Sequence, residues 1–183
     1  LIYQVCWQRL LFSAFGVDLE SITIIVSAFM LGLGIGAFWG GRMADRFPDH
    51  IIYIFSASEL AIGIFGFSSP LIISWTKLTF INAPESIIAA TNFVTLLPAT
   101  FLMGATLPLL TTHVNIYLKN IGSSIGSLYF INTLGASVGA ISAGFFLFNF
   151  LTINQSIYLA ATINCMAALM ILLFFKKENY ENK

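Results

Sequence analysis

Long apolar runs that are almost free of charge constrain this chain more than any other feature of its sequence. Only 9% of its residues are Asp, Glu, Lys or Arg, whereas soluble domains usually carry about 25%. A surface with so few charged groups is not stable against water, so lipid must be its main solvent. The runs are continuous rather than alternating, which favours membrane-spanning helices over the short strands of a barrel.

The apolar runs predict an all-α membrane protein that consists of a six-helix transmembrane bundle. The expected helices run from before residue 1 to 15, and over 21–41, 51–76, 86–110, 123–148 and 155–175. Together they form one domain, residues 1–175, followed over 176–183 by a charged cytoplasmic tail or the start of a linker. The chain opens directly on an apolar stretch at Leu1, so we expect the first helix to lack its opening turns.

The few basic residues predict how the bundle is oriented. Of the eight, six lie on one side of the membrane, in the segments 42–50 and 113–122 and in the tail. Lys77 lies on the other side, and Arg9 lies within the first helix. Because cytoplasmic loops carry an excess of Lys and Arg, we expect the richer side, with both termini, to be cytoplasmic. The expected location is the inner membrane of a bacterium.

Glycines at regular spacing predict where helices approach each other closely. Gly32, Gly36 and Gly40 recur every four residues and line one face of the second helix. Gly135 and Gly139 form a similar face, with neighbouring alanines, on the fifth helix. Both patterns are typical of close packing between membrane helices. The first stretch also contains a GxGxG string, but a dinucleotide loop needs a preceding strand and a water-facing crevice, so a nucleotide site is not expected.

Charged residues follow the first glycine run, in the segment GGRMADRF. This segment resembles the signature loop between helices two and three of major facilitator transporters, and six helices resemble half of such a transporter. The resemblance implies a charge-linked latch in which Asp45 is the acid and Arg42 and Arg46 are the basic members. An ordinary positively charged cytoplasmic loop is the alternative, because the sequence PDH at 48–50 departs from the family pattern.

A narrower family shares the motifs of nearly the whole chain in their order. These motifs are LIYQVCWQRLL, the glycine run, GGRMADR, the helix around Glu59, LPATFLMGATLPLL and LYFINTLGASVGAISAGF. Together they resemble the membrane domain of fused spermidine-synthase-like proteins, in which a half-transporter-like domain precedes an aminopropyltransferase-type domain. Gln4 stands where that family commonly has an acid. The sequence holds no recognisable aminopropyltransferase domain, so the resemblance implies a membrane module without that activity of its own.

Two ionisable residues at apparent membrane depth are the leading candidates for a binding site. Arg9 lies in the first helix and Glu59 in the third. An unpaired charge in hydrocarbon costs about 3 kcal/mol, so each should face the bundle interior or a polar cavity. We expect Glu59 to attract a cation or to titrate, with Arg9 as its counter-charge. The alternatives are a purely structural pair of the two, or an Arg9 that snorkels outward.

Polar side chains inside other helices are further candidates for such a site. Gln4, Tyr129 and Asn132 lie in apolar runs and would line a polar cavity, although interhelical hydrogen bonds account for most such groups in membranes. Pro98 and Pro108 in the fourth helix predict kinks of the kind found around transporter sites. Such prolines also occur in inert membrane helices, so they indicate a site only weakly.

No pattern in the sequence indicates catalysis, a metal or a cofactor. It contains no GxSxG, no HExxH and no Cys/His cluster. His50 and His113 are expected in loops, and Cys6 and Cys165 are expected to act as small buried hydrophobic residues. A net charge of zero argues against nucleic acid as a partner.

Two functions remain. The chain would transport or sense a small polar or cationic solute, or it would anchor a fused or associated soluble domain in the lipid bilayer. Six helices cannot alternate access by rocking two halves, so transport would require a homodimer.

Overall fold

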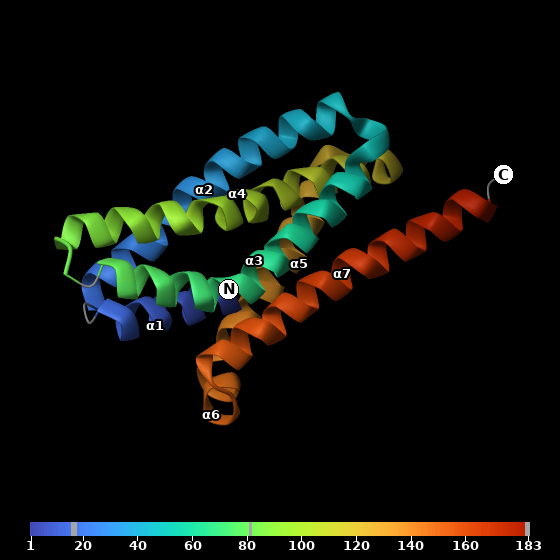
Figure 1. Cartoon of the computed structure of the whole chain (residues 1–183). Helices are drawn as coiled ribbons and strands as arrows, with labels where there is room; N and C mark the ends of the chain where they lie inside the picture. The colour runs from blue at the N-terminus through green and yellow to red at the C-terminus, as the bar shows by residue number, and fades with distance from the viewer. Residues whose placement is uncertain (16–17, 81, 182–183) are drawn as a thin grey trace.

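The computed structural model describes the backbone of residues 1–15, 18–80 and 82–181, and the side chains of these residues other than 14–21, 85 and 175–181. Its elements are α1 (Ile2–Phe15), α2 (Asp18–Arg46), the 3-10 turn η1 (Pro48–His50), α3 (Ile51–Phe80), α4 (Glu85–Leu118), α5 (Ile121–Ile141), the π-helical segment η2 (Ser142–Leu147), α6 (Phe148–Phe150) and α7 (Ile153–Glu181). Since α5, η2 and α6 follow one another without a break, the described chain forms six helical rods, as predicted (Figure 1).

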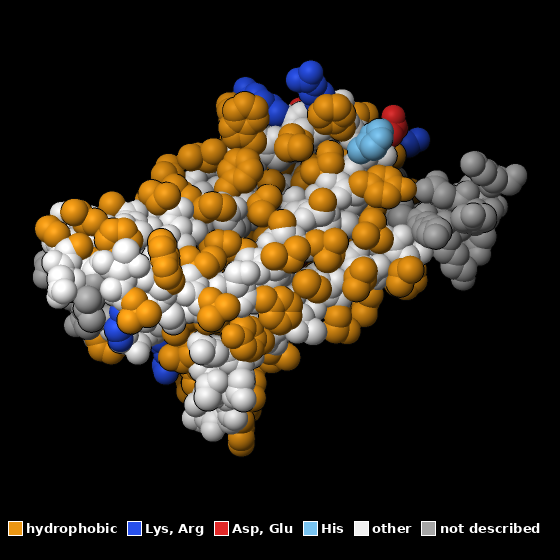
Figure 2. Space-filling view, viewed as in Figure 1, with side chains coloured by type: hydrophobic (Ala, Val, Ile, Leu, Met, Phe, Trp, Pro, Cys, Tyr) orange, Lys and Arg blue, Asp and Glu red, His pale blue; other side chains and the backbone are white. Residues whose placement is uncertain are grey.

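Most of these rods are long and apolar enough to cross a membrane. In the described residues there are five such spans: Ile22–Arg46, Pro48–Phe80, Ser86–Leu118, Ile121–Phe150 and Ile153–Phe174. α1 has only 14 residues, about 21 Å of helix against a hydrocarbon core of about 30 Å. Figure 2 shows hydrophobic side chains over the middle of the visible face and Lys and Arg side chains towards its two ends. This distribution is the one expected of a bundle that spans a bilayer.

On the side of the bundle that carries most basic residues, the helices extend further along the chain than predicted. α2 continues through Arg46, so the proposed latch residues lie on its last turns rather than in a loop. α4 continues to Leu118, so His113 is helical and not in a loop. α7 continues to Glu181, so the boundary predicted at residue 175 falls inside a helix. The apolar pattern marks where lipid ends, whereas a helix extends into water for as long as its hydrogen bonds and caps allow.

The turn between α4 and α5 shows such a cap. Lys119 has a left-handed backbone, with φ 50°, and its N–H bonds to the carbonyl of Asn115, which ends α4. Asn120 then opens α5, because its side-chain oxygen accepts a hydrogen bond from the N–H of Ser123 at 3.1 Å. The two helices are therefore joined by a tight reversal rather than by a loop.

α2 and α4 form the closest helix pair of the bundle, and they lie side by side in Figure 1. Gly32, Gly36 and Gly40 of α2 face α4. A Cβ atom added to Gly36 would collide with the carbonyl oxygen of Phe101, and one added to Gly40 would lie 2.6 Å from the Cα of Ala105. Only glycine permits this separation of the two backbones. We call this contact the α2–α4 seam.

Residues of both helices complete the seam. A Cβ on Gly32 would collide with the side chain of Thr100, and one on Gly104 of α4 would collide with the backbone of Leu33. The Thr100 hydroxyl lies 3.2 Å from the carbonyl oxygen of Ala28 on α2 and 3.1 Å from those of Leu96 and Leu97 on its own helix, so it can donate to α2 or within α4. The seam is therefore closed by glycines from both sides and bridged by a buried hydroxyl.

α1 packs against the inside of the bundle through its aromatic residues. Trp7 is fully buried, stacks on Tyr3 with ring centroids 5.0 Å apart, and meets Phe65 edge-on at 5.6 Å. Its indole N–H donates a hydrogen bond to Ser69 Oγ of α3 at 2.8 Å. This buried polar contact fixes how α1 is rotated against α3, because an indole N–H in an apolar interior needs an acceptor.

α5 packs far less closely than the other long helices. Within α5, which the structure describes completely, Ser124 is the only buried residue. A Cβ on Gly135 would meet no atom within 4 Å, and one on Gly139 would meet Ile2 Cγ1 at 3.6 Å. The close packing predicted for the glycines of α5 is thus not made at Gly135 by the described residues, because the nearest neighbouring helices touch α5 along only part of its length.

Candidate functional site

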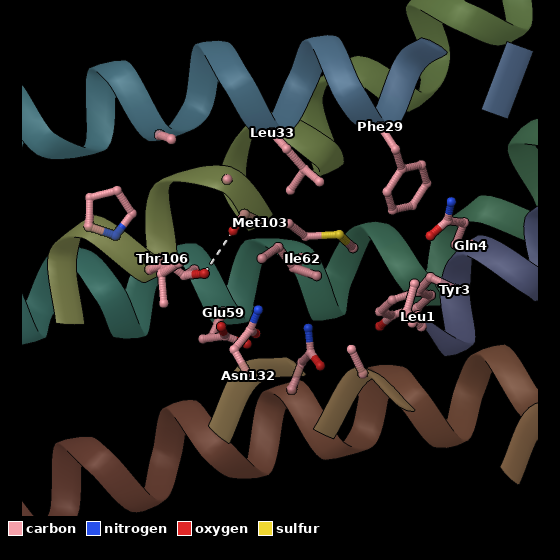
Figure 3. Close-up of a pocket in the computed structure, with 16 residues that line it drawn as sticks. Leu1, Tyr3, Gln4, Phe29, Leu33, Glu59, Ile62, Met103, Thr106 and Asn132 are labelled. Atoms are coloured by element: carbon pink, nitrogen blue, oxygen red, sulfur yellow. Dashed lines mark hydrogen bonds between the residues drawn. The ribbon is translucent and has the colours of Figure 1, made fainter. Parts of the chain in front are cut away.

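A cavity of about 500 Å³ lies between the helices, and residues of α1, α2, α3, α4, α5 and α7 line it. Figure 3 shows the side chains that reach into it from these helices. Its polar members are Tyr3, Gln4, Glu59, Thr106, Asn132 and Asn164. We call this space the Glu59 cavity.

Glu59 projects from the middle of α3 and is partly buried. It is the only residue with a charged side chain among those that line the cavity. Within the part of the chain that the structure describes, its carboxylate has no ion-pair partner. A carboxylate away from bulk water without a cationic partner is costly, so the cavity favours a ligand that brings positive charge.

Three side-chain amides surround the cavity from three different helices. Gln4 comes from α1, Asn132 from α5 and Asn164 from α7. Each amide offers a carbonyl oxygen as an acceptor and an NH₂ group as a donor. The Thr106 hydroxyl is already engaged, since it donates to the carbonyl of Met103 at 2.7 Å (Figure 3). The three amides therefore offer a bound molecule both donors and acceptors.

The remaining wall is apolar. Phe29 and Leu33 of α2, Ile62 of α3 and Met103 and Leu107 of α4 line it. Tyr3 adds its ring, while its hydroxyl is buried against Gly66 without a hydrogen-bond partner among the described residues. A cavity with one carboxylate, three amides and hydrophobic walls suits an organic cation with an apolar body.

The structure separates Arg9 from Glu59. Arg9 does not line the Glu59 cavity, and its guanidinium carbon lies 4.1 Å from the centre of the Phe148 ring. The two predicted members of a charge pair therefore do not meet. The helical period explains this, because five residues turn Arg9 about 140° away from Gln4, which does face the cavity.

The other predicted polar residues divide in the same way. Gln4 and Asn132 line the Glu59 cavity, as just described. Tyr129 is on the outside of α5 with its side chain 62% exposed, so the expectation that it lines the cavity is wrong. Asn132 is exposed as well, but it lies on the side of α5 that borders the cavity, whereas Tyr129 does not.

The proposed latch residues lie at one end of the bundle. The Arg42 guanidinium lies 3.6 Å from the ring centre of Phe38, and that of Arg46 lies 5.7 Å from the ring centre of Phe47. Asp45 is exposed and forms no ion pair with the residues that the structure describes. A latch between Asp45 and a neighbouring helix end stays a prediction.

Sequence reasoning did not select Asn164, Met103 or Thr106 as site residues. Asn164 carried a usable signal, since an amide inside an apolar helix needs polar surroundings. Met103 and Thr106 carried none, because both types are common on any packed helix. Their place in the cavity depends on the rotation of α4, which the seam with α2 sets.

Comparison with known proteins gives two relatives. The chain is 25% identical over 179 residues to a polyamine aminopropyltransferase of Oceanobacillus iheyensis, a match that covers 97% of this chain and 33% of the relative. It is 26% identical over 175 residues to a polyamine aminopropyltransferase of Corynebacterium efficiens, covering 93% of this chain and 32% of the relative. The chain thus spans about a third of the length of the curated relatives it matches. No protein-family profile and no solved structure matches it.

These relatives agree with the predicted resemblance at a coarse level. The chain has weak similarity to polyamine aminopropyltransferases over nearly all of its own length, and its helices are apolar enough for membrane spans. The fused arrangement and the half-transporter architecture stay predictions.

Proposed function

We propose that this chain is a membrane module that binds a small organic cation in the Glu59 cavity, for transport or sensing. The observation that carries the proposal is the single carboxylate of Glu59 inside a cavity whose other polar groups are neutral. The ammonium group of a ligand would lie at Glu59, and the amides of Asn132 and Asn164 would accept its remaining hydrogens. The apolar walls would contact its methylene groups.

Amines related to polyamines are the ligands that we propose first. The two relatives are named for an activity on polyamines, and linear alkylamines combine ammonium groups with methylene segments. The cavity's mixture of one carboxylate and hydrophobic walls fits this chemistry. Transport through the site would require a second copy of the bundle, because two halves must move against each other to alternate access.

The test is amine binding by the purified chain in detergent, with 1,4-diaminobutane and spermidine as probes in isothermal titration. Replacing Glu59 by Gln should weaken binding by about tenfold or more, since a charge-assisted hydrogen bond is lost. Asp49→Asn is the matched control, because it removes a carboxylate that is exposed outside the cavity. If Glu59→Gln binds the probes as well as the unchanged chain, the proposal is wrong.

A membrane anchor is the second candidate, and one observation favours it. The relatives extend over about three times the length of this chain, so most of each lies outside the matched segment. An anchor would hold an aminopropyltransferase-type domain at the membrane and would need no ligand in the cavity. Proteoliposomes that contain the chain distinguish the two functions: uptake of labelled spermidine that depends on Glu59 favours transport, and its absence together with absent binding favours the anchor.

A further inference from the structure

A second hollow, separate from the Glu59 cavity, lies beside α1. Gln8, Arg9, Phe12 and Ser13 of α1 line it together with Ile153, and its volume is about 400 Å³. None of these residues lines the Glu59 cavity. The bundle therefore places its membrane-deep carboxylate and the arginine of α1 in two different spaces. We call this second space the Arg9 hollow.

The side chain of Arg9 is held in a way that leaves its donors free. Its guanidinium lies over the ring of Phe148, with 4.1 Å between the guanidinium carbon and the ring centre. A cation–π contact of this kind does not use the N–H groups as hydrogen-bond donors to an acceptor atom, so they remain able to donate to a ligand. Arg9 is exposed and forms no ion pair with any residue that the structure describes. The charge is thus oriented by an aromatic ring but not neutralised.

The neighbours of Arg9 show at which depth in the membrane it lies. Phe148 is close to the end of the span Ile121–Phe150, and Ile153 is the first residue of the span Ile153–Phe174. The Arg9 hollow therefore lies where one candidate span ends and the next begins, a position expected at the edge of the hydrocarbon core. The phosphate groups of lipids lie at this level, on the side of the membrane opposite to Arg42 and Arg46.

We propose that the Arg9 hollow binds a phosphate group. The fork of the Arg9 guanidinium matches two phosphate oxygens, a geometry for which arginine is better suited than lysine. Gln8 and Ser13 also line the hollow, and their amide and hydroxyl groups supply further neutral donors there. Phe12 and Ile153 add apolar surface beside the charge. The phosphate belongs to a lipid headgroup or to a soluble phosphate ester, and both sources present the same chemistry.

The experiment measures binding of anionic lipid by the full chain in a zwitterionic detergent, by native mass spectrometry and by thermal stabilisation. Phosphatidylglycerol, phosphatidylcholine and inorganic phosphate are the three probes. Arg9→Gln should retain phosphatidylglycerol about tenfold less than the unchanged chain, because a charge-assisted contact is lost. Arg42→Gln is the matched control, since Arg42 also lies over an aromatic ring, Phe38, but does not line the hollow.

The outcomes separate the two sources of phosphate. Stabilisation by phosphatidylglycerol alone, lost in Arg9→Gln and kept in Arg42→Gln, supports a lipid headgroup. Stabilisation by inorganic phosphate with the same dependence on Arg9 supports a soluble phosphate ester. Equal retention of phosphatidylglycerol by Arg9→Gln and the unchanged chain, or equal losses in both variants, overturns the proposal. If Arg9→Gln proves hard to fold, Arg9→Lys replaces it: this variant keeps the charge but not the fork, so it should bind phosphatidylglycerol more weakly than the unchanged chain, and equal binding would overturn the proposal.

Discussion

The α2–α4 seam and the glycine face of α5 carry the same sequence pattern and have opposite surroundings. In the seam, a Cβ on Gly36 would collide with the backbone of α4, whereas one on Gly135 would meet nothing within 4 Å. Small residues at a spacing of four therefore permit close approach, but they do not determine whether another helix of the same chain occupies the space. What decides the outcome is which helices the rest of the fold brings alongside.

The largest expected loss of stability comes from placing a larger side chain in the α2–α4 seam. Gly36→Val would force the backbones of α2 and α4 apart at Phe101, and overpacking of this kind costs about 3 kcal/mol or more. The variant should lose its folded form in detergent, measured as aggregation in size-exclusion chromatography and as a lower thermal midpoint. Gly34→Val on the same helix is the control, because a Cβ there meets no atom within 4 Å. Equal stability of both variants would show that the seam is not tight.

A smaller loss of stability is expected from a substitution where α1 meets α3. Ser69→Ala removes the acceptor of the buried Trp7 indole N–H and should lower the free energy of unfolding by about 1 to 2 kcal/mol. The neighbouring Ser68→Ala is the control, because the Ser68 hydroxyl bonds only to the carbonyl of Ile64 within its own helix in the described structure. Unfolding in increasing dodecyl sulfate, followed by tryptophan fluorescence, measures both. A larger loss from Ser68→Ala would contradict the role given to Trp7.

The smallest change in stability is expected from a substitution on α5. Gly135→Ala enters open space and raises helix propensity, so it should leave stability unchanged or raise it by up to about 1 kcal/mol. The thermal midpoint and the oligomeric state in detergent would be measured together. A destabilised variant that also shifts from dimer to monomer would mean that a second copy of the chain covers this face of α5. The glycines of the seam would then pack within one chain, and those of α5 between two chains.

Much of the fold could be predicted from local composition. The runs 51–76 and 123–148 each lie within an observed rod, because a helix that satisfies its own backbone hydrogen bonds is the structure that a long apolar segment can form in lipid. The ends were less predictable. α2 continues past the apolar region to Arg46, since the end of a helix depends on caps and hydrogen bonds and not on hydropathy.

The candidate site was predictable only in part. Glu59, Asn132 and Gln4 were selected as polar residues in apolar helices, and all three line the cavity. Arg9 was selected by the same reasoning, yet it lies over Phe148 in a different hollow. A polar group in a membrane helix must find polar surroundings, and this rule selects candidate residues from the sequence. It does not predict which of them line the same cavity.

The sequence by itself determined the helical class of this protein, the approximate number of its helices and that most of them are apolar enough to span a membrane, because these follow from how much apolar surface each segment carries. The tertiary structure alone decided which residues meet: Gly36 lies against Phe101, Trp7 bonds to Ser69, and Glu59 shares a cavity with amides from three other helices rather than with Arg9. Each partnership depends on the rotation of two helices about their own axes. That rotation is set by all the contacts of the bundle together, and no single segment contains it.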